Sequence, residues 1–232
     1  MLYDERTLRE NIRNRDGKRV FFLGEKDRLT PSARDYVNRE GIELRPGEQA
    51  KPEKYRMENG AVLETKPEHM THLHSDVLVY KTHPRIRFRG EMDSLQADLL
   101  LCQLDMPEKA AHLGEILALA RKILGCEVMN EPLKEQPLCG LTQQELRSRS
   151  HRPQDYYGQP HFMPDAADGR QVLALNRCRC ACRRAELAAA AAFIREDGTV
   201  DREDILRALN RMSSMLYLLM IEEKANKGNK VM

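Results

Sequence analysis

The chain of 232 residues contains no tryptophan, and aromatic residues make up only 5% of it. Leu and Ala are abundant instead, so the composition favours a core of packed helices over a β-sandwich. Long apolar runs are missing too: no stretch of about 18 apolar residues occurs, which argues against a membrane span. The N-terminus is charged and lacks an apolar signal core. These absences predict a helical protein of the cytoplasm with no membrane partner.

A strong excess of either charge is also absent. Lys and Arg number 38 and Asp and Glu number 36, which leaves a formal net charge of +2. A general nucleic-acid binder is usually strongly basic, so this balance argues against nucleic acid as a partner. It does not exclude a local anion site. The six cysteines of a cytosolic chain are most simply reduced thiols.

The sequence of residues 1–68 indicates a small N-terminal α/β segment followed by a linker. The run RVFFLG at residues 19–24 is typical of a short buried strand. Thr30 is placed to cap a helix that has Pro31 at its first position. A second strand is expected at residues 42–44, and the polar, proline-containing stretch that follows favours a loop as far as residue 68. The sequence assigns no role to this segment.

Residues 69–232 predict a mainly α fold, a helical bundle in which apolar residues recur at helical spacing. Asp105 is placed as the N-cap of one helix, with Pro107 in its first turn. Residues 150–169 contain several Pro and Gly residues and predict a long loop, and loops of this length are often functional. The helices are expected at about residues 90–104, after Asp105, at about 170–195 and at about 202–225.

Two of these helices place polar side chains beside core residues. Arg179, Arg183 and Glu186 stand at i, i+4 and i+7, so they share one helix face. The last helix carries a polar stripe formed by Asn210, Ser214 and Tyr217, with Arg211 beside it. Polar groups on core-type helices need a partner, and a polyanionic ligand is the most economical one. Ordinary salt bridging on solvated faces is the alternative.

Three segments together carry a resemblance to a known family. Residues 179–186 read RCACRRAE, residues 209–217 read LNRMSSMLY, and residues 81–95 read KTHPRIRFRGEMDSL. In this order they resemble the motifs of the PduO-type corrinoid (cobalamin) adenosyltransferases, and most of all their ethanolamine-utilisation branch. The chain departs from the family pattern where Met212 replaces a Leu and where Thr82 and His83 replace two acidic residues.

The resemblance implies a fold, an activity and partners. The fold is the helical bundle of the adenosyltransferases. The implied activity transfers the 5′-deoxyadenosyl group of ATP to the Co(I) of cob(I)alamin, which makes adenosylcobalamin for ethanolamine utilisation. ATP, Mg²⁺ and cobalamin are the implied ligands. A homo-oligomer is implied, with a trimer favoured and ATP sites between subunits. A reductase and an adenosylcobalamin-dependent client enzyme are further implied partners, in the cytoplasm or inside a bacterial microcompartment.

The alternative function comes from a different class. A non-catalytic module would bind adenosylcobalamin or ATP and deliver it without making it. The chain lacks the Gly-rich run that precedes Thr71 and His72 in the family pattern, and this departure supports the alternative. A turnover assay separates the two functions.

The chemistry of the side chains and the resemblance to the family together predict the site residues. Arg183 is the first candidate phosphate ligand, because a planar guanidinium binds phosphate oxygens bidentately. Arg179 and Glu186 complete the expected catalytic group, in which the carboxylate holds ribose hydroxyls or braces an arginine. The resemblance places further contacts with ATP or the corrinoid at Thr71, His72, Lys81, Asp93, Phe162, Arg184, Asn210 and Arg211.

Two of these assignments have simpler alternatives. The resemblance implies that Asp93 forms an ion pair with a helix arginine of another subunit, whereas an acidic residue early in a helix can also just stabilise the helix dipole. It implies that Phe162 provides an apolar floor under the corrin, whereas a loop phenylalanine can also simply anchor its loop.

A metal site is not predicted. Ethanolamine-type relatives often carry a His and a Cys-Cys-x-x-Cys run before the motif that begins at Lys81, and this run is absent here. His69, His72 and His74 stand near that place and are weak candidates for a divalent metal site. Chance is the favoured explanation of their spacing.

Overall fold

The computed structural model describes residues 2–15, 18–46 and 55–230. The chain divides into two compact units, residues 1–67 and residues 68–232. Each unit has a hydrophobic core of its own, the first around Phe21 and the second around Leu95. Within the described residues, none of the helices combines the length and the apolar character needed to cross a bilayer.

The first unit is built around a strand–helix–strand. β3 (Lys18–Leu23) pairs in parallel with β5 (Glu43–Pro46), and α2 (Pro31–Arg39) connects them. The Thr30 side chain caps α2 by accepting from the Ala33 N–H, as the sequence predicts. The other elements are β1 (Leu2–Tyr3), α1 (Glu5–Glu10), β2 (Arg13–Arg15), β4 (Arg28–Leu29), β6 (Tyr55–Met57) and β7 (Val62–Leu63).

The predicted loop over residues 46–68 is wrong in part. β6 and β7 form an antiparallel hairpin in which Tyr55 pairs with Leu63. Strands of two or three residues are too short to give a readable alternation of apolar and polar side chains, so the sequence pattern misses them. Residues 47–54 of this stretch lie outside the described part of the chain.

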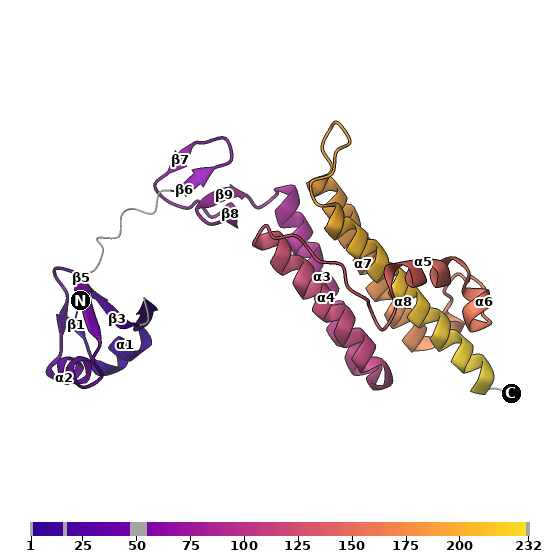
Figure 1. Cartoon of the computed structure of the whole chain (residues 1–232), viewed down its shortest axis with the longest axis horizontal. Helices are drawn as coiled ribbons and strands as arrows, with labels where there is room; N and C mark the ends of the chain where they lie inside the picture. The colour runs from indigo at the N-terminus through magenta and orange to yellow at the C-terminus, as the bar shows by residue number, and fades with distance from the viewer. Residues whose placement is uncertain (1, 16–17, 47–54, 231–232) are drawn as a thin grey trace. The chain divides into compact units, whose positions relative to one another are not determined.

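The second unit is a bundle of four long helices, visible in Figure 1 as two adjacent pairs. The helix α7 packs against both α3 and α8, and α4 packs against α3. Apolar side chains of all four helices fill the core, and most are completely buried. The mainly α prediction is therefore confirmed. The four helices are α3 (Pro84–Asp105), α4 (Ala110–Val128), α7 (Gly169–Phe193) and α8 (Glu203–Lys230).

The first helix of the bundle begins earlier than predicted. α3 starts at Pro84, because the His83 side chain accepts from the Arg85 N–H and the proline occupies the first helical position. The predicted N-cap Asp105 is wrong, since this residue ends α3 and its carboxylate accepts from Arg170 at 2.9 Å. A 3₁₀ turn, Pro107–Lys109, then leads into α4.

The long loop predicted over residues 150–169 is interrupted by helical turns. α5 (Gln143–His151) begins with a capping box between Thr142 and Glu145, and α6 (Pro153–Tyr157) ends at Gly158 in the left-handed region, with φ at 64°. A further 3₁₀ turn, Ala166–Asp168, precedes α7. The irregular loop is therefore confined to about residues 158–165.

A hairpin precedes the bundle and is held against it by a buried carboxylate. β8 (Met70–His74) and β9 (Val77–Tyr80) pair in antiparallel fashion. Glu127 of α4 is completely buried and accepts from the Nε of Arg85 and of Arg89, each at 2.6 Å. The Arg89 Nη2 also donates to the Leu73 carbonyl at 2.8 Å. This cluster joins α3, α4 and β8 through one charge-assisted network.

Candidate functional site

The candidate site is a hollow between α7, α8 and the loop before α7. It has a volume of about 670 Å³ and is open to solvent. Four of the residues predicted from the two C-terminal motifs, and one from the loop, line it together: Arg179, Arg183, Asn210, Arg211 and Phe162. The helical spacing of the two motifs explains this meeting, because each motif turns one face toward the other helix.

The arginines of α7 differ in how they are engaged. The guanidinium carbon of Arg179 lies 5.2 Å from the ring centroid of Tyr217, at cation–π distance. Arg183 is exposed and has no hydrogen-bond or ion-pair partner among the described residues. Arg184 does not line the hollow, since its Nε lies 3.4 Å from the Glu91 carboxylate on α3. Arg183 is therefore the cation most available to an anionic ligand.

Glu186 and Asn210 connect the two helices of the site. The Asn210 Nδ2 donates to the Glu186 Oε1 at 3.1 Å. This bond uses one of the two N–H groups of the amide and leaves the amide oxygen as an acceptor at the hollow. Glu186 thus braces an asparagine in the single chain, whereas the sequence suggested an arginine or a ribose.

Tyr217 of α8 connects the loop before α7 to α8 beside the hollow. The Phe162 N–H donates to the Tyr217 hydroxyl at 3.3 Å, and the His161 Nδ1 lies 3.0 Å from the same oxygen. The His161 Nε2 lies 3.2 Å from the His151 carbonyl, so it must donate there. The loop is therefore tied to α8 through the Tyr217 hydroxyl.

The Phe162 ring is held from two sides. It stacks on Tyr217 with ring centroids 6.2 Å apart, and the Lys224 ammonium lies 4.2 Å from its centroid. Lys224 is in turn paired with Asp168 at 2.7 Å. The sequence does not predict the roles of His161 and Lys224, because their contacts with Tyr217 and Phe162 join residues more than 50 positions apart.

The residues predicted near the hairpin lie apart from this hollow in the single chain. Lys81 pairs with Glu68 at 3.1 Å, and the His72 Nδ1 lies 3.0 Å from the Ser75 carbonyl. Thr71 is half-buried within β8. Asp93 is exposed on α3 and makes no hydrogen bond or ion pair with the described residues. None of these four predicted residues lines the hollow.

The three histidines of the hairpin do not converge. His69 stacks on Tyr80 with ring centroids 5.7 Å apart, and the strand register shifts between His72 and His74. In the part of the chain that the structure describes, no group of three His, Cys, Asp or Glu side chains is arranged to hold a metal ion.

The thiols near the site are of two kinds. Cys182 is buried, and burial raises the pKa of its thiol, which donates to the Leu209 carbonyl at 3.3 Å. Cys180 is exposed and lines the hollow. All six cysteines are free.

Comparison with known proteins gives a consistent result. A sequence model of the cobalamin adenosyltransferase family matches residues 61–223. The corrinoid adenosyltransferase EutT of Salmonella typhimurium is 38% identical over 157 residues, and that of Escherichia coli K12 is 37% identical over the same length. Each match covers 67% of this chain and 59% of the relative, so the chain spans less than two thirds of the length of the curated relatives.

A solved structure shows the same fold. It is a variant of the PduO-type ATP:corrinoid adenosyltransferase of Lactobacillus reuteri, complexed with cobalamin and ATP. The match covers 78% of this chain and 91% of that chain, with a TM-score of 0.50 and 16% sequence identity. The family match extends over the hairpin, the bundle and both C-terminal motifs, so the chain belongs to the cobalamin adenosyltransferase family.

Proposed function

We propose that the chain is an ATP:cob(I)alamin adenosyltransferase. In the reaction Co(I) donates an electron pair to the 5′ carbon of the ATP ribose, a Co–C bond forms, and the C–O bond to triphosphate breaks. The observation that carries the proposal is the hollow itself, which is lined both by Phe162 and by Arg183, a cation without a partner among the described residues. A highly anionic leaving group and a flat apolar cofactor need these two surroundings next to each other.

The residues of the hollow would bind and orient the substrates, because the corrinoid itself supplies the nucleophile. Arg183 and Arg179 would hold the triphosphate and stabilise the charge that builds up as it departs. Asn210, fixed by Glu186, would present its amide oxygen to a donor of the nucleoside. None of the side chains that line the hollow is a carboxylate, so Mg²⁺ would enter bound to the triphosphate.

The experiment that tests the function is a turnover assay with ATP and chemically reduced cob(I)alamin. Formation of adenosylcobalamin and triphosphate in equal amounts is expected. The alternative, a delivery module, binds adenosylcobalamin or ATP without turnover. Binding of both compounds with no product after many minutes would favour that alternative over catalysis.

A homo-oligomer, with a trimer favoured, completes the site in this proposal. Lys81, Thr71 and Asp93 lie outside the hollow of their own chain. A second copy can supply such residues, and the exposed Asp93 carboxylate is then free to pair with an arginine across the interface. Apolar side chains next to it on α3 support the interface: Leu100, Leu101 and Leu104 are 45%, 51% and 81% exposed.

Charging this apolar face is expected to separate the copies. The double variant Leu101→Asp/Leu104→Asp should shift the mass in solution to that of one chain and abolish turnover, because charges would have to be buried in the interface. Light scattering measures the mass. Val62→Asp, at an exposed position of β7, is the matched control. A double variant that keeps the parent's mass would show that this face of α3 is not an interface.

Phe162 is proposed to form an apolar floor under the corrin. An apolar group there keeps water and the dimethylbenzimidazole off the cobalt, and loss of axial ligands makes Co(II) easier to reduce. Phe162→Ala should therefore slow adenosylation severely when Co(II) must be reduced on the enzyme, and much less when Co(I) is supplied. Spectra of Co(II)cobalamin with enzyme and ATP report the four-coordinate state directly. An undiminished four-coordinate signal in the variant would point to Tyr156 or Tyr157 instead.

Catalysis is proposed to need no transition metal bound to protein side chains. The motive is the dispersed arrangement of His69, His72 and His74 and the missing cysteine run. Elemental analysis of protein purified without chelator should find no stoichiometric iron or zinc. The prediction fails if such a metal is present and is lost together with activity in His69→Ala or His72→Ala.

The biological setting stays a prediction. We propose that the product serves ethanolamine utilisation, through an adenosylcobalamin-dependent client enzyme and a separate reductase. The similarity to the two EutT adenosyltransferases supports this setting. Cytoplasmic location, with or without a microcompartment, is part of the same proposal.

A further inference from the structure

A second hollow adjoins the first and is strongly cationic. It lies between α5 and α8 and is lined by Arg147, His151, Arg152 and Arg211, with polar side chains such as Gln144 and Ser148 between them. No carboxylate lines it. Arg211 and His151 line the larger hollow as well, so the two are neighbours that share a wall.

Two of these arginines, like Arg183, have no carboxylate partner among the described residues, whereas Arg152 pairs with Asp155 at 4.0 Å. Arg147 makes no hydrogen bond or ion pair with the described residues. Arg211 carries the only buried side-chain nitrogen or oxygen without a hydrogen-bond partner in the described part of the chain, its Nε. By contrast Arg207, one turn earlier on α8, is paired with Glu203 at 2.6 Å.

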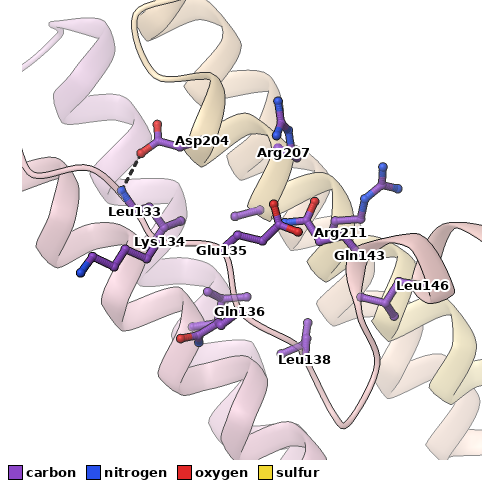
Figure 2. Close-up of a pocket in the computed structure, with 12 residues that line it drawn as sticks. Leu133, Lys134, Glu135, Gln136, Leu138, Gln143, Leu146, Asp204, Arg207 and Arg211 are labelled. Carbon is purple, nitrogen blue, oxygen red and sulfur yellow. Dashed lines mark hydrogen bonds between the residues drawn. The ribbon is translucent and has the colours of Figure 1, made fainter.

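The surroundings of Arg211 disfavour its positive charge. Burial, and then repulsion from Arg147 and Arg207, lower its pKa, while Glu135 acts weakly in the opposite direction. Figure 2 shows Glu135 on the segment before α5 and Arg211 on α8. No ion pair forms between Glu135 and Arg211. An anion bound in the hollow would offset the repulsion between the guanidinium groups.

An ordinary solvated face does not explain this arrangement. Solvated arginines lose little by standing without a carboxylate, but Arg211 is partly buried and is repelled by both Arg147 and Arg207. An oxyanion held in the hollow by the terminal Nη atoms of Arg211 and by Arg147 would offset this repulsion. The chemical class of ligand is therefore a phosphate-type anion.

We propose that this second hollow binds the phosphodiester of the corrinoid's nucleotide tail. The inference rests on the proposed function. The phosphodiester is the fixed negative charge of cobalamin, and the tail is released from the cobalt whenever the lower base detaches. The hollow shares a wall with the one that contains Phe162, so a tail hanging from a corrin there has a cationic surface within the same site. Arg183 would remain for the triphosphate of ATP.

The test compares two corrinoids that differ only in the tail. Equilibrium binding of cob(II)alamin and of cob(II)inamide, which lacks the nucleotide tail, is measured by absorbance in the presence of ATP. Arg147→Ala should weaken cob(II)alamin binding about tenfold, the scale of one lost charge-assisted hydrogen bond, and leave cob(II)inamide unchanged. Arg207→Ala removes the same charge from α8 at a residue that is already paired, and it should change neither.

The other outcomes are equally informative. Equal affinities of parent and Arg147→Ala for cob(II)alamin would overturn the proposal, and so would equal weakening of both corrinoids. A loss confined to ATP affinity would assign the hollow to the nucleotide's phosphates instead. A parent that binds neither corrinoid would overturn the proposed function itself, which is a different result from corrinoid binding that ignores the tail.

Discussion

Replacing Arg183 with Ala is expected to reduce the rate of adenosylation more than tenfold, which corresponds to a loss of about 1.4 kcal/mol or more of transition-state stabilisation. The residue lines the site hollow and has no partner among the described residues. Its charge is thus available to the triphosphate, whose negative charge is most exposed as the C–O bond breaks. A loss larger in kcat than in KM for ATP would show that the contact strengthens in the transition state.

Single-turnover kinetics with excess cob(I)alamin and ATP measure the effect on the chemical step. Arg177→Ala is the control, because Arg177 lies on the same helix but is paired with Asp98 at 3.1 Å. Arg183→Lys should recover only part of the rate, since an ammonium cannot form the bidentate contact. Unchanged kinetics in a folded Arg183→Ala protein would remove the residue from the site.

The site residues that could be predicted from the sequence are those that recur at the spacing of an α-helix. Arg179, Arg183, Asn210 and Arg211 occupy faces that recur every three or four residues, and the structure brings all four to one hollow. The local signals of α2 were equally readable, because the capping Thr30 and its proline act within one turn. Helix faces and helix caps depend only on residues close together in the chain, so they can be predicted from a single sequence.

What could not be predicted depends on partners far apart in the chain. His161 and Tyr217 meet across 56 positions, and Glu127 meets Arg89 across 38. Glu127 stands near the end of an apolar helix, where a glutamate would ordinarily face solvent. Its burial follows only from the way α3 and α4 pack. The sequence also did not reveal that Lys81 and Asp93 lie outside the hollow of their own chain, because that position too depends on how distant segments pack.

The cluster around Glu127 leads to the largest expected loss of stability. Glu127→Ala should lower the free energy of unfolding of the second unit by about 3–5 kcal/mol, because it leaves two arginine charges without their buried partner. The side chains of Arg85 and Arg89 are only 19% and 17% exposed, so water cannot replace the carboxylate fully. Urea unfolding followed by far-ultraviolet circular dichroism, which reports mainly on the bundle helices, measures the change.

The same change should also release the hairpin before the bundle. Arg89 donates to the Leu73 carbonyl, and without Glu127 its side chain is no longer held in place for this bond. Amide hydrogen exchange should therefore rise more in β8 and β9 than in α7. Glu131→Ala, at an exposed glutamate just beyond α4, should affect neither measurement. A triple variant with Arg85→Met, Arg89→Met and Glu127→Leu should regain much of the lost stability, because it removes the buried charges along with their partner. If the triple variant were no more stable than Glu127→Ala, the ion pairs would not be the cause, and packing around the glutamate stem would have to explain the loss.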